Sequence, residues 1–192
     1  SDKILFLSLK NKEICDASFS VQEIEKLANI GSENRKTEYI LGRHALKEVL
    51  SKINHDNDTS KISWPHLNCS LSHSDGYAVA VSCLESQGIG IDLQLNKTPP
   101  ATMAERILSK QSFAYWQALP NENKATELQR LWTVNEAIYK ACPVPQQPNF
   151  RCYQLSSPQC MQSDGFIDDT QYQFSIHSAK LVHGYITIAL RR

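Results

Sequence analysis

The sequence predicts an α+β protein built from two similar lobes that pack side by side. Each half of the chain runs through helical patterns first and strand patterns afterwards. A short segment also repeats weakly: residues 72–74 followed by 76–81 resemble residues 176–178 followed by 184–189. An internal duplication would explain this repeat, although a match this short can also arise by chance.

The first half begins with a predicted strand, followed by two helices and three further strands. Gly31 ends the first helix, and Ser32 is a suitable N-cap for the second. Leu41, Ala45 and Val49 give that second helix an apolar stripe at helical spacing. The elements expected here are helices over residues 20–30 and 32–53, and strands over residues 3–9, 67–72, 77–84 and 88–94.

The second half begins after a predicted hinge at residues 97–100. Pro99 and Pro100 cannot continue a strand, so the chain is expected to divide into lobes at residues 1–97 and 98–192. Pro143 ends the last helix, and a loop rich in Pro and Gln follows. The elements expected here are helices over residues 101–108, 111–119 and 123–141, and strands over residues 150–155, 172–177 and 185–191.

Composition favours an ordinary soluble protein of the cytoplasm. In 192 residues, 20 Lys and Arg balance 20 Asp and Glu, so no global charge indicates a nucleic-acid or membrane partner. The six cysteines form no C-x-x-C pair, and no signal peptide or membrane-length apolar run is seen. We therefore expect a reduced chain without structural disulfides.

A predicted strand places an acidic residue where a cation could bind. In the segment GIGIDLQ, strand alternation puts Gly90, Asp92 and Gln94 on one face. Gly90 leaves room for a ligand or another backbone to approach that face. A carboxylate there suits a hard cation, but an Asp at a strand end can equally begin a turn.

The helix that contains RLWTVNEAIYKA carries a polar stripe. Gln129, Thr133, Glu136 and Lys140 recur at helical spacing. The stripe could bring an acid and a base into a site. Glu136 and Lys140 could equally form an ordinary surface ion pair four residues apart.

A histidine and a basic helix complete the set of candidates. His73 lies between Ser72 and Ser74, so it could donate to a phosphate, serve a serine hydrolase or be structural. The second helix carries basic side chains that could hold phosphates or simply form a solvated face. These basic residues are Arg35, Lys36, Arg43 and Lys47.

In order and spacing, these segments resemble the motifs of the 4'-phosphopantetheinyl transferase superfamily, in its long two-lobe branch. Residues 68–81 (NCSLSHSDGYAVAV) resemble the family's N-x-S-H-S segment with one extra residue, and residues 89–92 resemble its (I/V)-G-(I/V)-D motif. Residues 132–140 (WTVNEAIYK) resemble W-(S/T)-x-K-E-(A/S)-x-x-K, which is specific. The basic helix resembles the family's R-x-x-(F/Y)-x-x-x-R pattern more loosely.

The resemblance implies a fold and an activity. The two lobes would be related by pseudo-twofold symmetry, with the active site in the cleft between them. The protein would be a monomeric, Mg2+-dependent enzyme with holo-acyl-carrier-protein synthase activity. It would transfer 4'-phosphopantetheine from coenzyme A to a serine of an apo acyl or peptidyl carrier protein and release adenosine 3',5'-bisphosphate. The carrier could serve fatty-acid, polyketide or nonribosomal peptide biosynthesis.

The resemblance also implies residue roles. Asp92 and Glu136 would ligate Mg2+, and Gln94 could join them. Glu136 would also accept the serine proton, and Lys140 would neutralise charge on the pyrophosphate. The residues expected to bind coenzyme A are Arg35, Arg43, His73 and Lys140.

Two departures from the family motifs support alternative functions. Asn135 replaces a common Lys, which would remove a positive charge near the phosphates, and Gln94 replaces a common Glu. A coenzyme A-binding sensor or scaffold with weakened catalysis is therefore one alternative. A protein-interaction module with an exposed aromatic patch is another, formed by Phe113, Tyr115 and Trp116.

Overall fold

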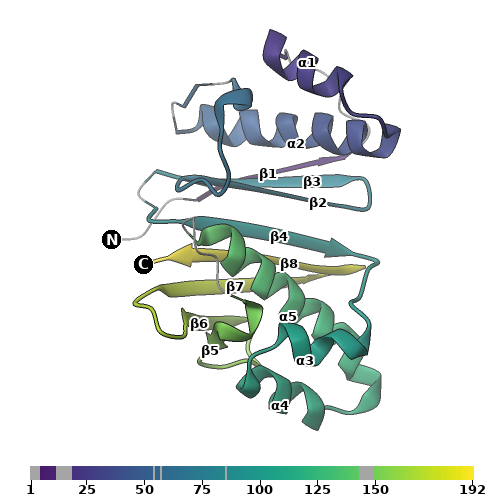
Figure 1. Cartoon of the computed structure of the whole chain (residues 1–192), viewed down its shortest axis with the longest axis vertical. Helices are drawn as coiled ribbons and strands as arrows, with labels where there is room; N and C mark the ends of the chain where they lie inside the picture. The colour runs from purple at the N-terminus through teal and green to yellow at the C-terminus, as the bar shows by residue number, and fades with distance from the viewer. Residues whose placement is uncertain (1–4, 12–18, 54, 57, 85, 143–148) are drawn as a thin grey trace.

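A computed structural model describes residues 5–11, 19–53, 55–56, 58–84, 86–142 and 149–192, and it confirms the predicted α+β class. Strands form a three-stranded sheet in the order β1-β3-β2 and a five-stranded sheet in the order β4-β8-β7-β6-β5 (Figure 1). The strands are β1 (Leu5–Asn11), β2 (Cys69–Ser74), β3 (Tyr77–Cys83), β4 (Ile89–Leu95), β5 (Tyr153–Leu155), β6 (Gln162–Ile167), β7 (Gln173–Leu181) and β8 (Gly184–Arg191).

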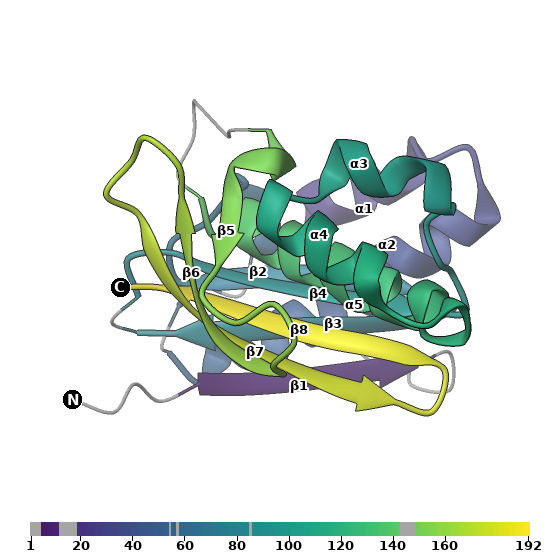
Figure 2. The same cartoon turned by 90° about the horizontal axis from the view of Figure 1, so that it is seen from below.

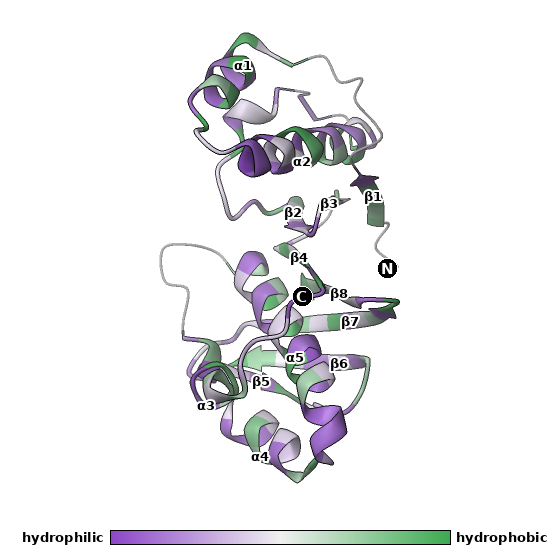
Figure 3. Cartoon of the chain, turned by 90° about the vertical axis from the view of Figure 1, so that its right-hand side faces the viewer, coloured by the Kyte–Doolittle hydropathy of each residue, from purple (hydrophilic) through white to green (hydrophobic). Residues whose placement is uncertain are grey.

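Helices α3, α4 and α5 lie on one face of the second sheet (Figure 2), whereas α2 and α1 lie beyond the first sheet, so that α1 and α4 mark opposite ends of the molecule (Figure 3). Ser20 caps α1 in a capping box with Glu23, and α2 begins directly after Ser32. The helices are α1 (Val21–Ala28), α2 (Glu33–Ser51), α3 (Ala104–Ile107), α4 (Lys110–Ala118) and α5 (Asn121–Ala141). Short 3₁₀ turns are η1 (Thr59–Lys61), η2 (Ala101–Met103) and η3 (Phe150–Cys152).

The two sheets share a pairing pattern, in line with the weak sequence repeat. In the first sheet, β2 and β3 form a hairpin and β1 pairs antiparallel with β3. In the second sheet, β7 and β8 form a hairpin and β4 pairs antiparallel with β8. One long helix packs on each sheet: α2 on the three strands of the first, and α5 mainly on β8 and β4 of the second. The division of the chain after residue 97 stays a prediction; strand pairing alone would place the boundary between β3 and β4.

Serine hydroxyl groups join the two sheets where β2 runs beside the free edge of β4. Three serines of β2 alternate with Leu71 and His73, which face α2, so the serine side chains all point to the opposite side and reach the same edge. Their Oγ atoms take the place of backbone carbonyls and accept the β4 N–H groups. The donor–acceptor distances are 3.0 Å for Ile91 to Ser70, 3.2 Å for Leu93 to Ser72 and 2.9 Å for Leu95 to Ser74. The sheets are therefore fixed in register at this junction.

The sequence does not predict β6, and some predicted elements reach beyond the described residues. The β6 segment QSDGFI is polar and contains Asp164-Gly165, a pair typical of turns. Its inward positions are Gly165 and Ile167, and Gly165 admits the side chain of Ile176. Residues 3 and 4 of the first predicted strand and the predicted stop at Pro143 lie outside the described residues.

Gly90 lets α5 pack directly on β4. A Cβ atom at Gly90 would overlap the carbonyl oxygen of Ala137 and lie 2.7 Å from the backbone nitrogen of Ala141. The close approach expected from the sequence is therefore that of another backbone.

We predict that Gly90→Ala lowers the free energy of unfolding by about 2 kcal/mol or more, because neither backbone can yield as a side chain would. Chemical denaturation measures the loss. Gly31→Ala is the matched control, since a Cβ atom there meets nothing within 4 Å. Equal effects at the two positions would contradict the packing argument.

Candidate active site between β4 and α5

Asp92 is the centre of a hydrogen-bonded cluster on the face of β4 that α5 covers. Its side chain is almost fully buried. The Oδ1 atom accepts from Ser72 Oγ at 2.9 Å and from Lys140 Nζ at 2.7 Å, and Oδ2 accepts from Gln94 Nε2 at 3.1 Å. Asp92 thus does not begin a turn; it is a paired carboxylate inside the fold.

Lys140 reaches Asp92 from the last turn of α5. Its ammonium group also donates to the carbonyl oxygen of Ile91 at 3.0 Å. Glu136 lies one turn earlier on the same helix. The surface ion pair that Glu136 and Lys140 could have formed is replaced by an ion pair between Lys140 and a buried acid.

Glu136 is electrostatically coupled to this cluster. Its pKa is raised, first because burial disfavours the charged carboxylate and second because of the negative charge of Asp92. The positive charge of Lys140 acts in the opposite direction. Two acids from different elements therefore share one half-buried location, an arrangement that a cation would stabilise.

The rest of the predicted polar stripe holds α5 against the second sheet. Gln129 Nε2 donates to the carbonyl oxygens of Gln94 and Lys97, at 3.3 and 3.0 Å. The Thr133 hydroxyl is buried 2.8 Å from the hydroxyl of Thr187 on β8. These contacts fix the helix register that presents Glu136 and Lys140 to Asp92.

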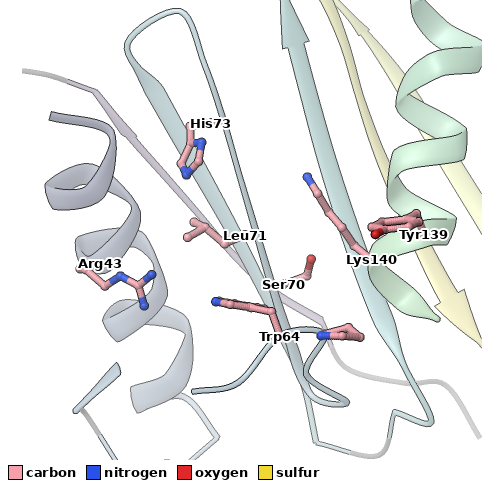
Figure 4. Close-up of a pocket in the computed structure, with 8 residues that line it drawn as sticks. Arg43, Trp64, Ser70, Leu71, His73, Tyr139 and Lys140 are labelled. Carbon is pink, nitrogen blue, oxygen red and sulfur yellow. The ribbon is translucent and has the colours of Figure 1, made fainter. Parts of the chain in front are cut away.

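A pocket of about 390 Å³ opens beside the cluster, between α2, β2 and the end of α5 (Figure 4). Three predicted site residues, Arg43, His73 and Lys140, line it together. Lys140 points away from α5 toward β2. The remaining lining residues are Trp64, Pro65, Ser70, Leu71 and Tyr139.

His73 carries its imidazole at the boundary between this pocket and a second one. Its pKa is lowered, mainly because surrounding protein atoms remove water from the ring. Glu38 opposes that shift, whereas Lys140 and Arg43 add to it. At neutral pH the ring is therefore neutral and can both donate and accept a hydrogen bond.

The second pocket, of about 220 Å³, brings Arg35 and Arg43 together with His73. Two buried polar atoms there have no hydrogen-bond partner within the described chain, the Tyr39 hydroxyl and Arg43 Nε. Arg43 instead donates through Nη1 to Thr59 and stacks its guanidinium 4.8 Å from the Tyr39 ring centre. Both atoms belong to residues that line the pocket, although the atoms themselves are buried.

The other two basic residues of α2 are engaged with acids. Lys36 pairs with Glu33 at 2.7 Å, and Lys47 pairs with the fully buried Glu23 at 2.7 Å. Of the four basic residues, Arg35 and Arg43 are the two that line the smaller pocket.

Comparison with known proteins decides the family. A model of the 4'-phosphopantetheinyl transferase superfamily matches residues 88–189, just over half of the chain. The chain belongs to this superfamily. A holo-[acyl-carrier-protein] synthase of Staphylococcus saprophyticus subsp. saprophyticus is 24% identical over 106 residues, which cover 55% of this chain and 87% of that protein.

The superfamily match covers one side of the site only. It includes Asp92, Gln94, Glu136 and Lys140, on β4 and α5. Arg35, Arg43 and His73 lie before the matched residues and are joined to the cluster by the pocket that Lys140 also lines. The roles of all these residues in a transferase reaction stay predictions.

Asn135 does not face the phosphate side of the site, although the superfamily motif led us to expect this. Its side chain is buried, and its amide donates to the carbonyl oxygen of Ile107 at the end of α3. Asn135 thus joins α5 to α3 in this chain. A lysine at this position would place its charge on the core side of α5.

We predict that Asn135→Ala lowers the free energy of unfolding by about 1–3 kcal/mol, because the buried Ile107 carbonyl loses its donor. Urea denaturation provides the measurement. Asn123→Ala, at an exposed position of the same helix, should change stability by no more than about 0.5 kcal/mol. An Asn135 variant as stable as wild type would contradict the structural role.

Two alternative interpretations lose their structural basis. Ser72 and His73 are neighbours on β2, so their side chains point to opposite faces, and the Ser72 hydroxyl is engaged with Asp92. Trp116 is buried, and Phe113 and Tyr115 pack against the same core, so they form no exposed aromatic patch.

Sequence reasoning gave no role to the aromatic residues of the two pockets. Trp64 comes from the loop before β2, Tyr139 precedes Lys140, and Tyr39 lies one turn before Arg43. The helical spacing of Tyr39 and Arg43 was a usable signal; the position of Trp64 depends on tertiary structure.

The donor set of the cluster fits one hard cation through two carboxylates. Mg2+ commonly takes one or two protein carboxylates and completes its shell with phosphate and water oxygens. Within the described part of the chain, no three His, Cys, Asp or Glu side chains gather as a closed metal site. Across the same described residues, no helix has the length and apolar character needed to cross a bilayer.

Proposed function

We propose that this protein transfers 4'-phosphopantetheine from coenzyme A to a serine of an apo carrier protein, with Mg2+ as cofactor. The observation that carries the proposal is the meeting of Asp92 and Lys140 beside Glu136, at a pocket that His73 and Arg43 also line. Acids that suit a cation thus lie next to a pocket lined by basic side chains, and Lys140 belongs to both groups, as a pyrophosphate substrate requires.

The basic side of the cleft would hold coenzyme A. Arg35 and Arg43 both line the smaller pocket, where guanidinium groups favour the acceptor oxygens of the nucleotide phosphate. His73 lies between that pocket and the one lined by Lys140. The coenzyme would therefore run from α2 across β2 toward α5.

The acidic side of the cleft would hold Mg2+. Asp92 and Glu136 are the ligands we propose, and Gln94 is placed to orient Asp92 or to contribute its amide oxygen. When bound, the cation neutralises charge on the pyrophosphate. Lys140 would add a second positive charge on the same phosphates, from the position it now holds against Asp92.

The transfer step needs a proton acceptor for the carrier serine. The serine Oγ would attack the β-phosphorus, and the bond from that phosphorus to the bridging oxygen would break. Adenosine 3',5'-bisphosphate leaves with the bond electrons, and the serine proton passes to Glu136 directly or through water. Burial and the charge of Asp92 raise the pKa of Glu136, which increases the affinity of this carboxylate for the serine proton.

One chain contains both sides of this cleft, so we infer a working monomer. The carrier would approach the open side of the pocket beside Tyr139 and Lys140, two residues that retain exposed or partly exposed surface.

The proposal is tested by incubating the protein with an apo acyl carrier protein, coenzyme A and Mg2+ and measuring the intact mass of the carrier. We expect a gain of one phosphopantetheine group, abolished by EDTA and by Asp92→Ala or Glu136→Ala. Coenzyme A binding without mass gain on any of several carriers would indicate the sensor or scaffold function instead. If the protein neither bound coenzyme A nor changed the mass of any carrier, the proposed function would be contradicted.

A further inference from the structure

We propose that Ser72 is a positioning residue that fixes which oxygen of Asp92 faces the cation. The inference rests on the proposed function in assuming that Asp92 binds a divalent cation. The hydroxyl of Ser72 is buried between two strands, where it accepts the Leu93 N–H at 3.2 Å and lies 2.9 Å from Asp92 Oδ1. Because a hydroxyl has one proton and the Leu93 contact uses a lone pair, that proton is directed at Asp92.

The hydrogen bonds to Asp92 make its two carboxylate oxygens inequivalent. Oδ1 receives two donors, Ser72 and Lys140, whereas Oδ2 receives Gln94. A carboxylate oxygen has about two acceptor positions. The pair of donors saturates Oδ1, so Oδ2 keeps an open position for a cation. Without Ser72, the carboxylate could rotate or share Lys140 between both oxygens.

The neighbouring serines separate this role from a merely structural one. Ser70 and Ser74 accept β4 N–H groups at the same kind of distance as Ser72. Ser74 directs its hydroxyl to the Leu95 carbonyl oxygen at 3.4 Å and not to an acid. All three serines therefore hold the sheets together, and the contact with Asp92 distinguishes Ser72.

A hydrogen-bond partner behind a metal ligand commonly changes metal affinity by about 10–100-fold when it is removed. Ser72→Ala deletes the donor to Oδ1, and it also deletes the acceptor for Leu93. Ser74→Ala deletes the equivalent acceptor for Leu95 and leaves Asp92 untouched. The two variants are therefore matched in their structural loss and differ in their effect on the ligand.

The experiment titrates the full chain with Mn2+ in the presence of coenzyme A, with free Mn2+ measured by electron paramagnetic resonance. We expect the Mn2+ dissociation constant to rise about tenfold in Ser72→Ala and to stay within about twofold in Ser74→Ala. Thermal unfolding should show a similar loss of Tm in both. Equal dissociation constants in the two variants would overturn the inference, and so would wild-type affinity in Ser72→Ala.

A second variant keeps the test decisive where Ser72→Ala does not fold. Ser72→Cys keeps a similar shape but donates only weakly, so its Mn2+ dissociation constant should be higher than that of wild type. A Ser72→Cys protein with unchanged affinity overturns the inference. Wild-type protein that modifies a carrier and binds Mn2+ upholds the proposed function whatever the Ser72 variants do, whereas failure of both wild-type reactions overturns both proposals.

Discussion

Lys140→Met should lower the rate of carrier modification by about a hundredfold to a thousandfold, the effect of removing one donor that stabilises charge in a transition state. Lys140 is the nearest cation to Asp92, and it lowers the pKa of Glu136 against the effects of burial and of Asp92. Its loss therefore raises the pKa of Glu136 further. Because the ionised carboxylate accepts the serine proton in the proposed reaction, the acidic limb of the pH–rate profile should move to higher pH. Rates measured from carrier mass across pH test both effects.

Lys124→Met is the matched control for this experiment. Lys124 belongs to the same helix, and its ammonium lies 5.5 Å from the centre of the Trp116 ring, not in the acidic cluster. We expect its rate to stay within about twofold of wild type and its acidic limb to stay in place, since surface charges contribute little. If both variants behaved alike, net charge rather than position would explain the loss.

Arg43→Met should weaken coenzyme A binding by about 10–100-fold, as expected for a hydrogen bond to a charged group. Arg43 lines both pockets, and its buried Nε has no partner in the described structure. The variant also loses its contact with Thr59, so stability should fall by about 1 kcal/mol. Isothermal titration with coenzyme A measures the affinity, and urea denaturation measures the stability.

Lys36→Met controls for the charge of α2. Lys36 is on the same helix and pairs with Glu33, so its removal should change coenzyme A affinity by less than about twofold. Adding salt should reduce the difference between wild type and Arg43→Met only partly, because the Arg43 site is partly buried. Affinity unchanged in Arg43→Met would exclude this pocket as the phosphate site.

Local pattern placed the residues of the Asp92 cluster on the correct faces of their elements but left their roles open. Strand alternation put Gly90 and Asp92 on one face of the strand, and helical spacing put Glu136 and Lys140 on one face of the helix. The structure packs those two faces together, because Gly90 admits the backbone of α5. These residues could be predicted because each signal lies within one element.

Contacts between distant segments could not be predicted in the same way. The serines of β2 alternate as in any strand, and nothing local indicates that their hydroxyls would replace a partner strand for β4. Asn135 lies inside a superfamily motif, yet its direction depends on how α3 crosses α5. The polar composition of β6 hid a strand whose pairing is supplied by β5 and β7. Tertiary packing overrides local propensity at each of these places.

The most direct test of phosphopantetheine transfer is to count both products in one reaction. The adenosine 3',5'-bisphosphate released from coenzyme A is quantified by chromatography, and the modified carrier is quantified by intact mass. We predict equal amounts of the two, both dependent on Mg2+ and both lost in Asp92→Ala. Bisphosphate released without a gain in carrier mass would mean hydrolysis of coenzyme A, and that result would contradict transfer to a carrier serine.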